Sequence, residues 1–285
     1  MKVKYSKLIS VKQLKFLLEQ ANCDNLIVLD ASVLDVNALQ ANPLSWPNFV
    51  ISDSKRFDLK NNFSDKNSKL PYTLPTTEQF QQHARLLGVN NDSQVVVYDD
   101  IGLYSAPRAW WMFKAMGCKS VAVLDGGLPE WLAQGENTNN GVGNKSVDIG
   151  NFVAIPSDRY FCDKQSVKKT LLTNDHIIID ARSADRFTGE VKDPRVGVRN
   201  GHIPSSFNLP FNQLQHQGKM LPENNLKVKL SELISEKNKI VFSCGSGITA
   251  CILALAADIC GYQHITVYDG SWSDWGSDHS LPISP

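Results

Sequence analysis

Short, continuously apolar segments recur along the chain, separated by longer stretches with a different pattern. In the first half they cover residues 27–29, 95–98 and 121–124, and valine, isoleucine and leucine dominate them. A segment without apolar–polar alternation is typical of a strand buried on both faces of a parallel sheet. The pattern therefore predicts parallel strands whose sheet is covered on both sides.

The stretches between the apolar segments have helical spacing. Residues 76–87 begin at a threonine, a suitable N-cap, and end before Gly88, and residues 105–116 predict a second helix. In the second half, residues 249–260 are apolar nearly all round, as expected for a buried helix. Alternating strands and helices of this kind predict an α/β fold with helices on both faces of each sheet.

The same series of segments occurs twice. The strand ending at Asp30 has a counterpart ending at Asp180, and Asp99 at the end of the next strand aligns with Cys244. In the third pair, residues 121–131 and 265–275, an apolar segment is followed by Asp-Gly and then by a tryptophan in both halves. The offsets stay between 144 and 150 residues, so that order and spacing are kept. We therefore expect two copies of one domain.

A polar stretch separates the two copies. Residues 134–150 are rich in glycine and asparagine and have no periodic apolar pattern, which is typical of a linker or surface loop. We expect an N-terminal domain over residues 1–135, a linker over 136–155 and a C-terminal domain over 156–285. Residues 51–72 are also irregular and polar, and we expect them to form an ordered loop of the first domain.

Composition and charge narrow the range of functions. The 285 residues are 42% hydrophobic, and 29 basic residues balance 29 acidic ones. A neutral chain lacks the basic field that binds nucleic acid or an anionic membrane surface. No apolar run approaches the roughly 18 residues of a membrane span, and lysines interrupt the N-terminal apolar stretch. We therefore expect a cytoplasmic protein without nucleic-acid or membrane partners.

The cysteines and histidines suggest no metal site. They form neither a CxxC pair nor an HExxH motif, so zinc has no obvious ligand set. A chain of this length without an export signal is expected to keep its thiols reduced. Five of the six cysteines lie in apolar helices or in unremarkable surroundings, and we expect them to be structural: Cys23, Cys118, Cys162, Cys251 and Cys260.

Cys244 has different surroundings. It follows a predicted buried strand over residues 239–243, and Gly245 and Gly247 come next, before the helix over 249–260. The glycines let successive N–H groups turn inward and form an anion-binding nest, and the positive end of the helix adds to the same field. Such a nest favours a thiolate nucleophile and would equally stabilise a persulfide anion. We therefore predict that Cys244 is a nucleophile, the alternative being a structural cysteine before a tight turn.

Two kinds of chemistry use a glycine-flanked cysteine loop. A cysteine phosphatase needs an arginine about six residues after the nucleophile to bind phosphate, and usually has a histidine just before it. Here these positions are Ala250 and Ser243. Because that arginine is missing, the loop would bind phosphate poorly. The loop therefore favours sulfur chemistry.

The duplicated architecture and several local motifs resemble a known family. Residues 244–250, Cys-Gly-Ser-Gly-Ile-Thr-Ala, the segment 201–204, Gly-His-Ile-Pro, and the closing segment 268–276 are similar to those of the two-domain rhodanese superfamily, and within it of the 3-mercaptopyruvate sulfurtransferases. The resemblance covers nearly the whole chain. It implies tandem rhodanese-like α/β domains, each a mainly parallel sheet with helices on both faces. It also implies a catalytic second domain, with Asp99 in the place of the nucleophile in the first.

The resemblance also implies site residues. Arg186 and Arg195 match the family's pair of substrate-binding arginines, and a guanidinium suits a carboxylate. Ser246 matches a candidate proton relay, the alternative being a loop residue that makes a local hydrogen bond. The other loop residues expected to bind the substrate are Gly245, Gly247, Ile248 and Thr249.

The activity implied is the transfer of sulfur from 3-mercaptopyruvate to a thiol, reduced thioredoxin or cyanide, through a persulfide on Cys244 and with release of pyruvate. Thiosulfate is a dianion, and the relatives that use it place basic residues where this chain has Gly245 and Ser246. Two alternatives stay open: a thiosulfate:cyanide sulfurtransferase, and a persulfide carrier that serves a partner protein without turnover. No metal or organic cofactor is implied.

The first half departs from the family pattern at two positions. Lys60 stands where the family usually has an acidic residue, and Tyr72 stands where it usually has a histidine. A proton relay that uses a first-domain acid is therefore in doubt. His202 and Asp180 are expected to hold the local backbone.

Overall fold

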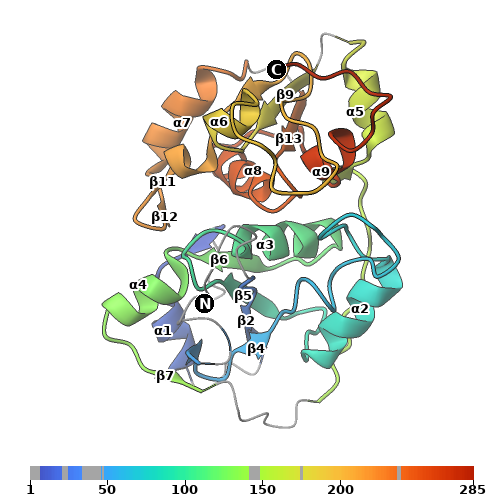
Figure 1. Ribbon diagram of the computed structural model, residues 1–285. Helices are drawn as coiled ribbons and strands as arrows, with labels where there is room; N and C mark the ends of the chain where they lie inside the picture. The colour runs from blue at the N-terminus through green and yellow to red at the C-terminus, as the bar shows by residue number, and fades with distance from the viewer. Residues whose placement is uncertain are drawn as a thin grey trace. The chain divides into compact units, whose positions relative to one another are not determined.

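The computed structural model describes residues 7–20, 25–33, 46, 48–140, 148–173, 176–235 and 239–285. Within this part of the chain two compact units form (Figure 1). The first comprises Met1–Lys66, Pro75–Ser157 and Gln217–Met220, and the second comprises Asn67–Leu74, Asp158–His216 and Leu221–Pro285.

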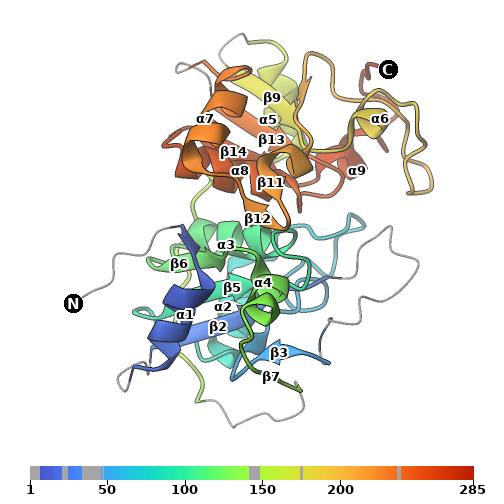
Figure 2. The same cartoon turned by 90° about the vertical axis from the view of Figure 1, so that its left-hand side faces the viewer.

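The first unit is built on a five-stranded sheet in which every pairing is parallel. Figure 2 shows its central strands side by side. The order across the sheet is β1 (Leu8–Ile9), β6 (Val121–Leu124), β5 (Gln94–Tyr98), β2 (Leu26–Asp30) and β4 (Lys55–Arg56). A short antiparallel pair joins β3 (Val50–Ile51) to β7 (Thr138–Asn139).

Helices cover both faces of this sheet. On one face, α1 (Val11–Leu18) and α4 (Gly127–Ala133) pack with the β2, β5 and β6 side chains in one apolar cluster. On the other face, phenylalanines of α2 (Thr77–Leu86) and α3 (Ala106–Ala115) pack edge to face. Burial of such side chains contributes roughly 2–3 kcal/mol each, which is why apolar residues on both faces specify a sandwiched sheet.

The second unit repeats the arrangement. All pairings in its main sheet are parallel, and the order is β10 (Phe207–Asn208), β9 (His176–Asp180), β13 (Lys239–Ser243), β14 (Ile265–Tyr268) and β8 (Phe161–Cys162). Its described helices are α5 (Lys164–Thr170), α6 (Ala184–Phe187), α7 (Glu223–Ser231), α8 (Ala250–Ile259) and α9 (Ser271–Trp275), with a 3₁₀ turn at Phe211–Leu214. The strand β11 (Gln215–His216) also belongs to this unit, whereas β12 (Lys219–Met220) belongs to the first unit.

The core of the second unit also has two layers. The α8 helix packs on β13 and β14 from one face, and its residues 250–257 are all buried. On the opposite face, α5 and α9 contribute Val167, Trp272 and Trp275 to a cluster with β9, β13 and β14 side chains. A helix that is apolar all round fits a position covered on every side.

The two sheets match strand for strand. The pairing of β2 with β5 runs from Leu26 opposite Gln94 to Asp30 opposite Tyr98, and that of β9 with β13 runs from His176 opposite Lys239 to Asp180 opposite Ser243. Both strands that precede the aligned residues Asp99 and Cys244 therefore lie in the same sheet position. The predicted fold class, tandem α/β domains with mainly parallel sheets and helices on both faces, is confirmed.

The predicted strands and helices occur where expected, including the N-cap at Thr76, whose hydroxyl accepts a hydrogen bond from the Gln79 N–H. One expectation differs. Residues 51–72 do not form a loop of one domain, because Lys55–Arg56 adds the edge strand β4 and Asn67–Leu74 belongs to the second unit. The physical reason is a tertiary contact: the Leu74 N–H donates to the Asp269 carboxylate at 2.8 Å.

The stretch predicted as a linker is partly described. Residues 148–155 belong to the first unit, where the Phe152 ring packs near Phe80 and Phe113 and the Arg85 Nε donates to the Phe152 carbonyl at 2.7 Å. Residues 141–147 and Cys23 lie outside the described residues. The domain bounds 1–135, 136–155 and 156–285 stay a prediction.

The length and hydropathy of the helices bear on membrane insertion. Within the described ranges, no helix is long and apolar enough to cross a membrane.

Candidate active site

Cys244 lies immediately after β13, at the carboxyl end of the sheet. Cys244 is 1% exposed, and its Sγ accepts a hydrogen bond from the Gly247 N–H at 3.1 Å. Gly247 has φ +77°, a left-handed conformation that glycine adopts without strain. The loop therefore turns a backbone donor onto the sulfur, as expected for an anion-binding nest.

The start of α9 holds the cysteine loop in place. The Trp272 N–H donates to the Cys244 carbonyl at 2.9 Å. The Ser273 N–H and hydroxyl both donate to the Gly245 carbonyl, at 3.0 and 2.6 Å. The Ser271 hydroxyl oxygen accepts the Cys244 N–H at 3.2 Å and donates to the Tyr268 carbonyl at 2.8 Å. Cys244 is thus held in place through its own backbone groups.

Arg186 and Arg195 lie against this loop, far from it in sequence. A Cβ placed on Gly245 would stand 3.1 Å from Arg195 Nη2 and 3.5 Å from Arg186 Nη2. A Cβ at position 245 would be tight against Arg195, whose guanidinium would have to give by a few tenths of an ångström. The absence of a side chain at Gly245 therefore leaves room for two cations close to the cysteine loop.

A buried carboxylate joins the two arginines. Asp193 Oδ2 pairs with Arg186 Nη2 at 2.8 Å, and Asp193 Oδ1 pairs with Arg195 Nη1 at 3.2 Å. The Asp193 side chain is 2% exposed, whereas those of Arg186 and Arg195 are 18% and 19% exposed. Sequence reasoning missed Asp193. The available signal was an acidic residue located between two arginines that were expected to share a ligand.

The remaining predicted site residues belong to the same loop. Ser246 and Ile248 are 5% and 4% exposed, and Thr249 is the N-cap residue of α8 without a side-chain capping bond. The ten-residue α8 helix begins directly after the loop, so its positive end adds to the field at the sulfur. The structure therefore brings together every predicted site residue.

Asp180 and His202 contact the scaffold. Asp180 forms an ion pair of 2.7 Å with Arg182, both side chains being 2% exposed, and the Arg182 guanidinium lies 4.6 Å from the Trp272 ring centre. His202 stacks on Phe187, with ring centroids 3.7 Å apart, and its Nδ1 lies 2.9 Å from the Phe187 carbonyl. These contacts hold the loops that surround the cysteine.

The other described cysteines have different surroundings. Burial raises the pKa of the Cys118 thiol to about 11 and that of Cys162 to about 12. The Cys251 Sγ donates to the Gly247 carbonyl at 3.2 Å, and the Cys260 Sγ lies 3.9 Å from the Glu223 carbonyl. In the described part of the chain, no group of three or more His, Cys, Asp or Glu side chains is placed to hold a metal ion.

The first unit has an equivalent loop after β5, with Asp99 at the position of the cysteine. Asp99 is completely buried, and its carboxylate accepts five backbone N–H groups at 2.8 to 3.0 Å. The donors are Ile101, Gly102, Tyr104, Ser105 and Ala106. This loop is also an anion-binding nest, and the chain's own carboxylate fills it.

Lys60 and Tyr72 belong to different units. Lys60 is exposed and lies in the first unit. Tyr72 has φ +60° and lies on Asn67–Leu74, which packs as part of the second unit.

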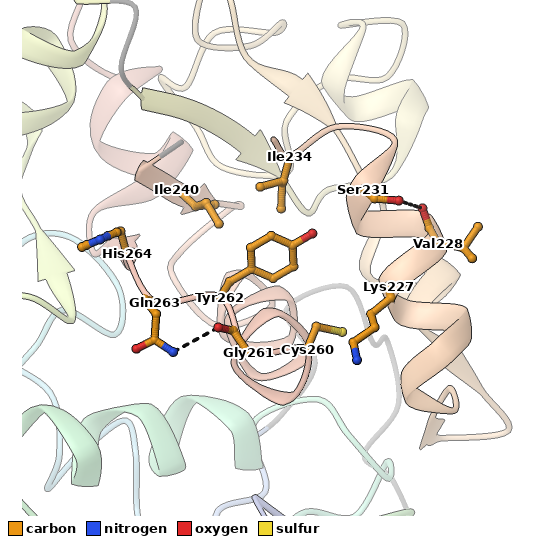
Figure 3. Close-up of a pocket in the computed structure, with 10 residues that line it drawn as sticks. All are labelled: Lys227, Val228, Ser231, Ile234, Ile240, Cys260, Gly261, Tyr262, Gln263 and His264. Atoms are coloured by element: carbon orange, nitrogen blue, oxygen red, sulfur yellow. Dashed lines mark hydrogen bonds between the residues drawn. The ribbon is translucent and has the colours of Figure 1, made fainter. Parts of the chain in front are cut away.

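A cavity of about 630 Å³ lies elsewhere in the second unit (Figure 3). Ile240 near the start of β13 and His264 before β14 line it, so it opens at the amino end of the strands, whereas Cys244 follows their carboxyl end. The Tyr262 ring lies in its middle, and the Cys260 sulfur points toward Lys227 (Figure 3). In α/β sheets of this kind ligands gather at the carboxyl ends, which favours the cysteine loop as the functional site.

Comparisons with curated proteins give named relatives. A thiosulfate/3-mercaptopyruvate sulfurtransferase of Arabidopsis thaliana, named mitochondrial, is 37% identical over 248 residues, which cover 80% of this chain and 65% of that protein. The 3-mercaptopyruvate sulfurtransferase of Escherichia coli K12 is 38% identical over 78% of this chain and 79% of its own length. The rat thiosulfate sulfurtransferase is 32% identical over 96% of this chain and 93% of its own length.

Solved structures agree with the fold. The crystal structure of the 3-mercaptopyruvate sulfotransferase SseA from Escherichia coli matches with a TM-score of 0.83 and 31% identity, over 94% of this chain and 99% of that one. The Tum1 protein of Saccharomyces cerevisiae matches with a TM-score of 0.86 and 27% identity, over 98% of both chains.

The family match covers both halves of the chain. Residues 10–134 and 163–278 each match the rhodanese-like domain. The repeated sheet order, the cysteine loop after β13 and its acidic counterpart after β5 agree with this match. The chain belongs to the family of rhodanese-like domain proteins.

Proposed function

We propose that this protein is an enzyme that takes sulfur from 3-mercaptopyruvate onto Cys244, releases pyruvate, and passes the sulfur to a thiol or cyanide. The observation that carries the proposal is the approach of two guanidiniums to the cysteine loop, with Arg195 Nη2 at 3.1 Å from a Cβ built on Gly245. A carboxylate held by these guanidiniums is placed beside a sulfur nucleophile. A monocarboxylate that also carries sulfur is the donor that suits both features.

The first half-reaction transfers sulfur to the enzyme. The Cys244 thiolate attacks the substrate sulfur, a sulfur–sulfur bond forms, and the carbon–sulfur bond breaks. Its electron pair passes into the enolate of pyruvate, which takes up a proton to give pyruvate. The guanidiniums stabilise the developing negative charge, and the N–H of Gly247 stabilises the anionic persulfide that remains on Cys244.

The second half-reaction returns the enzyme to its starting state. A thiolate or cyanide attacks the outer sulfur of the persulfide, and the Cys244 thiolate leaves with its electron pair. A small thiol, reduced thioredoxin and cyanide all serve as acceptors in this scheme. Ser246, buried in the same loop, is proposed as the proton relay of the first half-reaction.

Thiosulfate is the alternative donor. Relatives named for both donors, or for thiosulfate alone, are 32 to 37% identical to this chain over the aligned residues. The loop here offers Gly245 and Ser246 directly after the cysteine, without the side-chain cations that a dianion would favour. This difference supports 3-mercaptopyruvate as the preferred donor.

The test compares kcat/KM for 3-mercaptopyruvate and thiosulfate with one common thiol acceptor. We expect a preference for 3-mercaptopyruvate of at least about a hundredfold, lost in Cys244→Ala. Arg195→Ala is expected to raise KM for 3-mercaptopyruvate by about tenfold or more while leaving an already formed persulfide reactive toward thiols. A preference for thiosulfate, or full activity of Cys244→Ala, would contradict the proposal.

A persulfide carrier without turnover is the second alternative, because carrying and catalysing need the same cysteine. Multiple turnovers with a small thiol acceptor support the enzyme, whereas one sulfur transferred per Cys244 and a stable complex with a partner protein support the carrier. Cytoplasmic location stays a prediction. A plant relative is named mitochondrial, and cell fractionation is the measurement that decides.

A further inference from the structure

The two arginines of the proposed site share one acidic partner. Asp193 contacts Arg186 at 2.8 Å and Arg195 at 3.2 Å, through separate carboxylate oxygens. The same Oδ1 also accepts the Arg195 backbone N–H at 3.0 Å, and the Asp193 N–H donates to the Asn200 side chain at 3.1 Å. Asp193 is therefore held by backbone and side-chain bonds, and it fixes both guanidiniums relative to the loop.

The same contacts set the charge that a donor meets. Two guanidiniums and one carboxylate in contact have a net charge of +1, and the Asp193 side chain is only 2% exposed, so solvent screens it weakly. The neighbouring ion pair between Asp180 and Arg182 is internally neutral. A donor with one negative charge is matched by this site. A dianion carries one charge in excess, next to a cysteine that must itself be anionic to react.

We propose that Asp193 is a specificity-determining residue: it positions the arginine pair and lowers its charge, so that a monoanionic sulfur donor is preferred to a dianionic one. This inference rests on the proposed function, since it assumes that the donor binds at the arginine pair. Asp193 acts through the arginines and does not itself touch the donor.

The kinetic test uses Asp193→Asn, which keeps an oxygen for the Arg195 N–H but removes the charge. We expect the ratio of kcat/KM for 3-mercaptopyruvate to that for thiosulfate to fall by about tenfold or more, mainly through KM for thiosulfate. Asp193→Glu, which restores the charge, is expected to recover most of the ratio. The matched control is Asp185→Asn, an exposed acid beside Arg186, which should change the ratio less than about twofold. An equal loss for both donors in Asp193→Asn would show a merely structural role and overturn the proposal.

A second readout does not depend on turnover. The Cys244 peptide is quantified after alkylation by iodoacetate, an anion, and by iodoacetamide, a neutral reagent of similar size. The rate ratio of iodoacetate to iodoacetamide should rise by about threefold or more in Asp193→Asn, should not change in Asp185→Asn, and should shrink toward the wild-type ratio at high salt. If the enzyme uses neither sulfur donor but the iodoacetate-to-iodoacetamide rate ratio rises in Asp193→Asn, the proposed function fails and the role of Asp193 stands. If the ratio stays constant, the role of Asp193 fails even when both donors are used.

Discussion

The loop after β5 and the loop after β13 occupy the same place in two copies of one fold, and both collect backbone N–H groups around one side chain. In the first unit that side chain is Asp99, which is fully buried and accepts five N–H groups. In the second unit it is Cys244, whose sulfur accepts the N–H of Gly247. The same arrangement of backbone N–H groups thus binds a carboxylate in one copy and a cysteine sulfur in the other.

The backbone contacts behind the two loops are also shared. The Leu128 N–H donates to the Asp99 carbonyl as the Trp272 N–H donates to that of Cys244, both at 2.9 Å. The residue before each donor has positive φ: Gly127 has +52° and Ser271 has +49°. Glycine adopts this conformation freely, whereas serine is strained in it. In the second unit the strain comes with a hydroxyl that binds the Cys244 N–H.

The comparison teaches that the same loop scaffold can hold a carboxylate in one copy and a thiol in the other. An anion-binding loop left empty and buried would hold several unsatisfied N–H groups, each at a cost of about 1–3 kcal/mol. A carboxylate removes that cost at once. In the first unit the Asp99 carboxylate therefore acts as a structural anchor of this loop.

The largest expected effect is on activity in the second unit. Cys244→Ala should lower turnover by about 10⁴-fold or more, because no other described thiol lies in an open nest. Its free energy of unfolding should change by less than about 1 kcal/mol, since the sulfur accepts only the Gly247 N–H at 3.1 Å and a long bond from the Ser271 hydroxyl at 3.9 Å. Steady-state kinetics and urea unfolding measure the two quantities. Retained turnover would move the nucleophile to another residue.

The matching change in the first unit should affect stability. Asp99→Ala leaves five N–H groups without their acceptor, those of Gly102, Ser105 and Ala106 being buried, and we expect a loss of about 3–5 kcal/mol in unfolding free energy. Because two units can unfold separately, hydrogen exchange of first-unit amides is the suitable measurement. Asp92→Ala, an exposed acid of the same unit, is the control and should change stability by less than about 0.5 kcal/mol. If Asp99→Ala changed the unfolding free energy of the first unit only slightly, the Asp99 carboxylate would not be the structural anchor of this loop.

Two partly buried cysteines that lie outside the nests, Cys118 and Cys162, give a third contrast. Burial raises the pKa of Cys118 to about 11 and of Cys162 to about 12, so at pH 8 both remain neutral thiols. Iodoacetamide should modify them about a hundredfold more slowly than a free cysteine, followed by mass spectrometry of each peptide. Their rates should rise as the pH approaches these values, and stability should fall with increasing pH above about 9, because the unfolded chain ionises first. Fast labelling of the folded protein at pH 8 would contradict the burial argument.

The smallest expected effect concerns Ser271, the strained counterpart of Gly127. Ser271→Gly removes the strain and the hydroxyl, whereas Ser271→Ala removes only the hydroxyl. We expect both variants to lower kcat/KM by about tenfold, because the Cys244 N–H loses the hydroxyl that accepts it. We expect Ser271→Gly to be more stable than Ser271→Ala by about 1 kcal/mol, because glycine adopts the positive φ without strain. Full activity of either variant would show that the hydroxyl does not position the nucleophile.

Much of this fold was open to prediction because its signals are local. Continuous apolar runs such as 95–98 identify strands covered on both faces, and Gly88 and Gly117 mark helix ends through their left-handed backbone. The geometry of the cysteine loop was also predictable, since Cys244, Gly245 and Gly247 belong to one short turn, whereas the role of Cys244 as nucleophile stays a prediction. The duplication followed from the regular spacing of these signals.

Other features depend on contacts between distant segments. Asn67–Leu74 belongs to the second unit through a bond from Leu74 to Asp269. No local pattern marks that choice, because a polar irregular segment can pack wherever its backbone donors find acceptors.

The sequence by itself determined the strand and helix alternation, the two copies of the domain and the cysteine loop, because hydrophobic spacing and glycine positions act over a few residues. Only the tertiary structure decided that the Asp99 carboxylate fills the first nest and that Asp193 joins two arginines beside the second. Both depend on where charged side chains meet backbone or one another after folding. Their energies come from burial and from exact distances, which the linear order of residues does not contain.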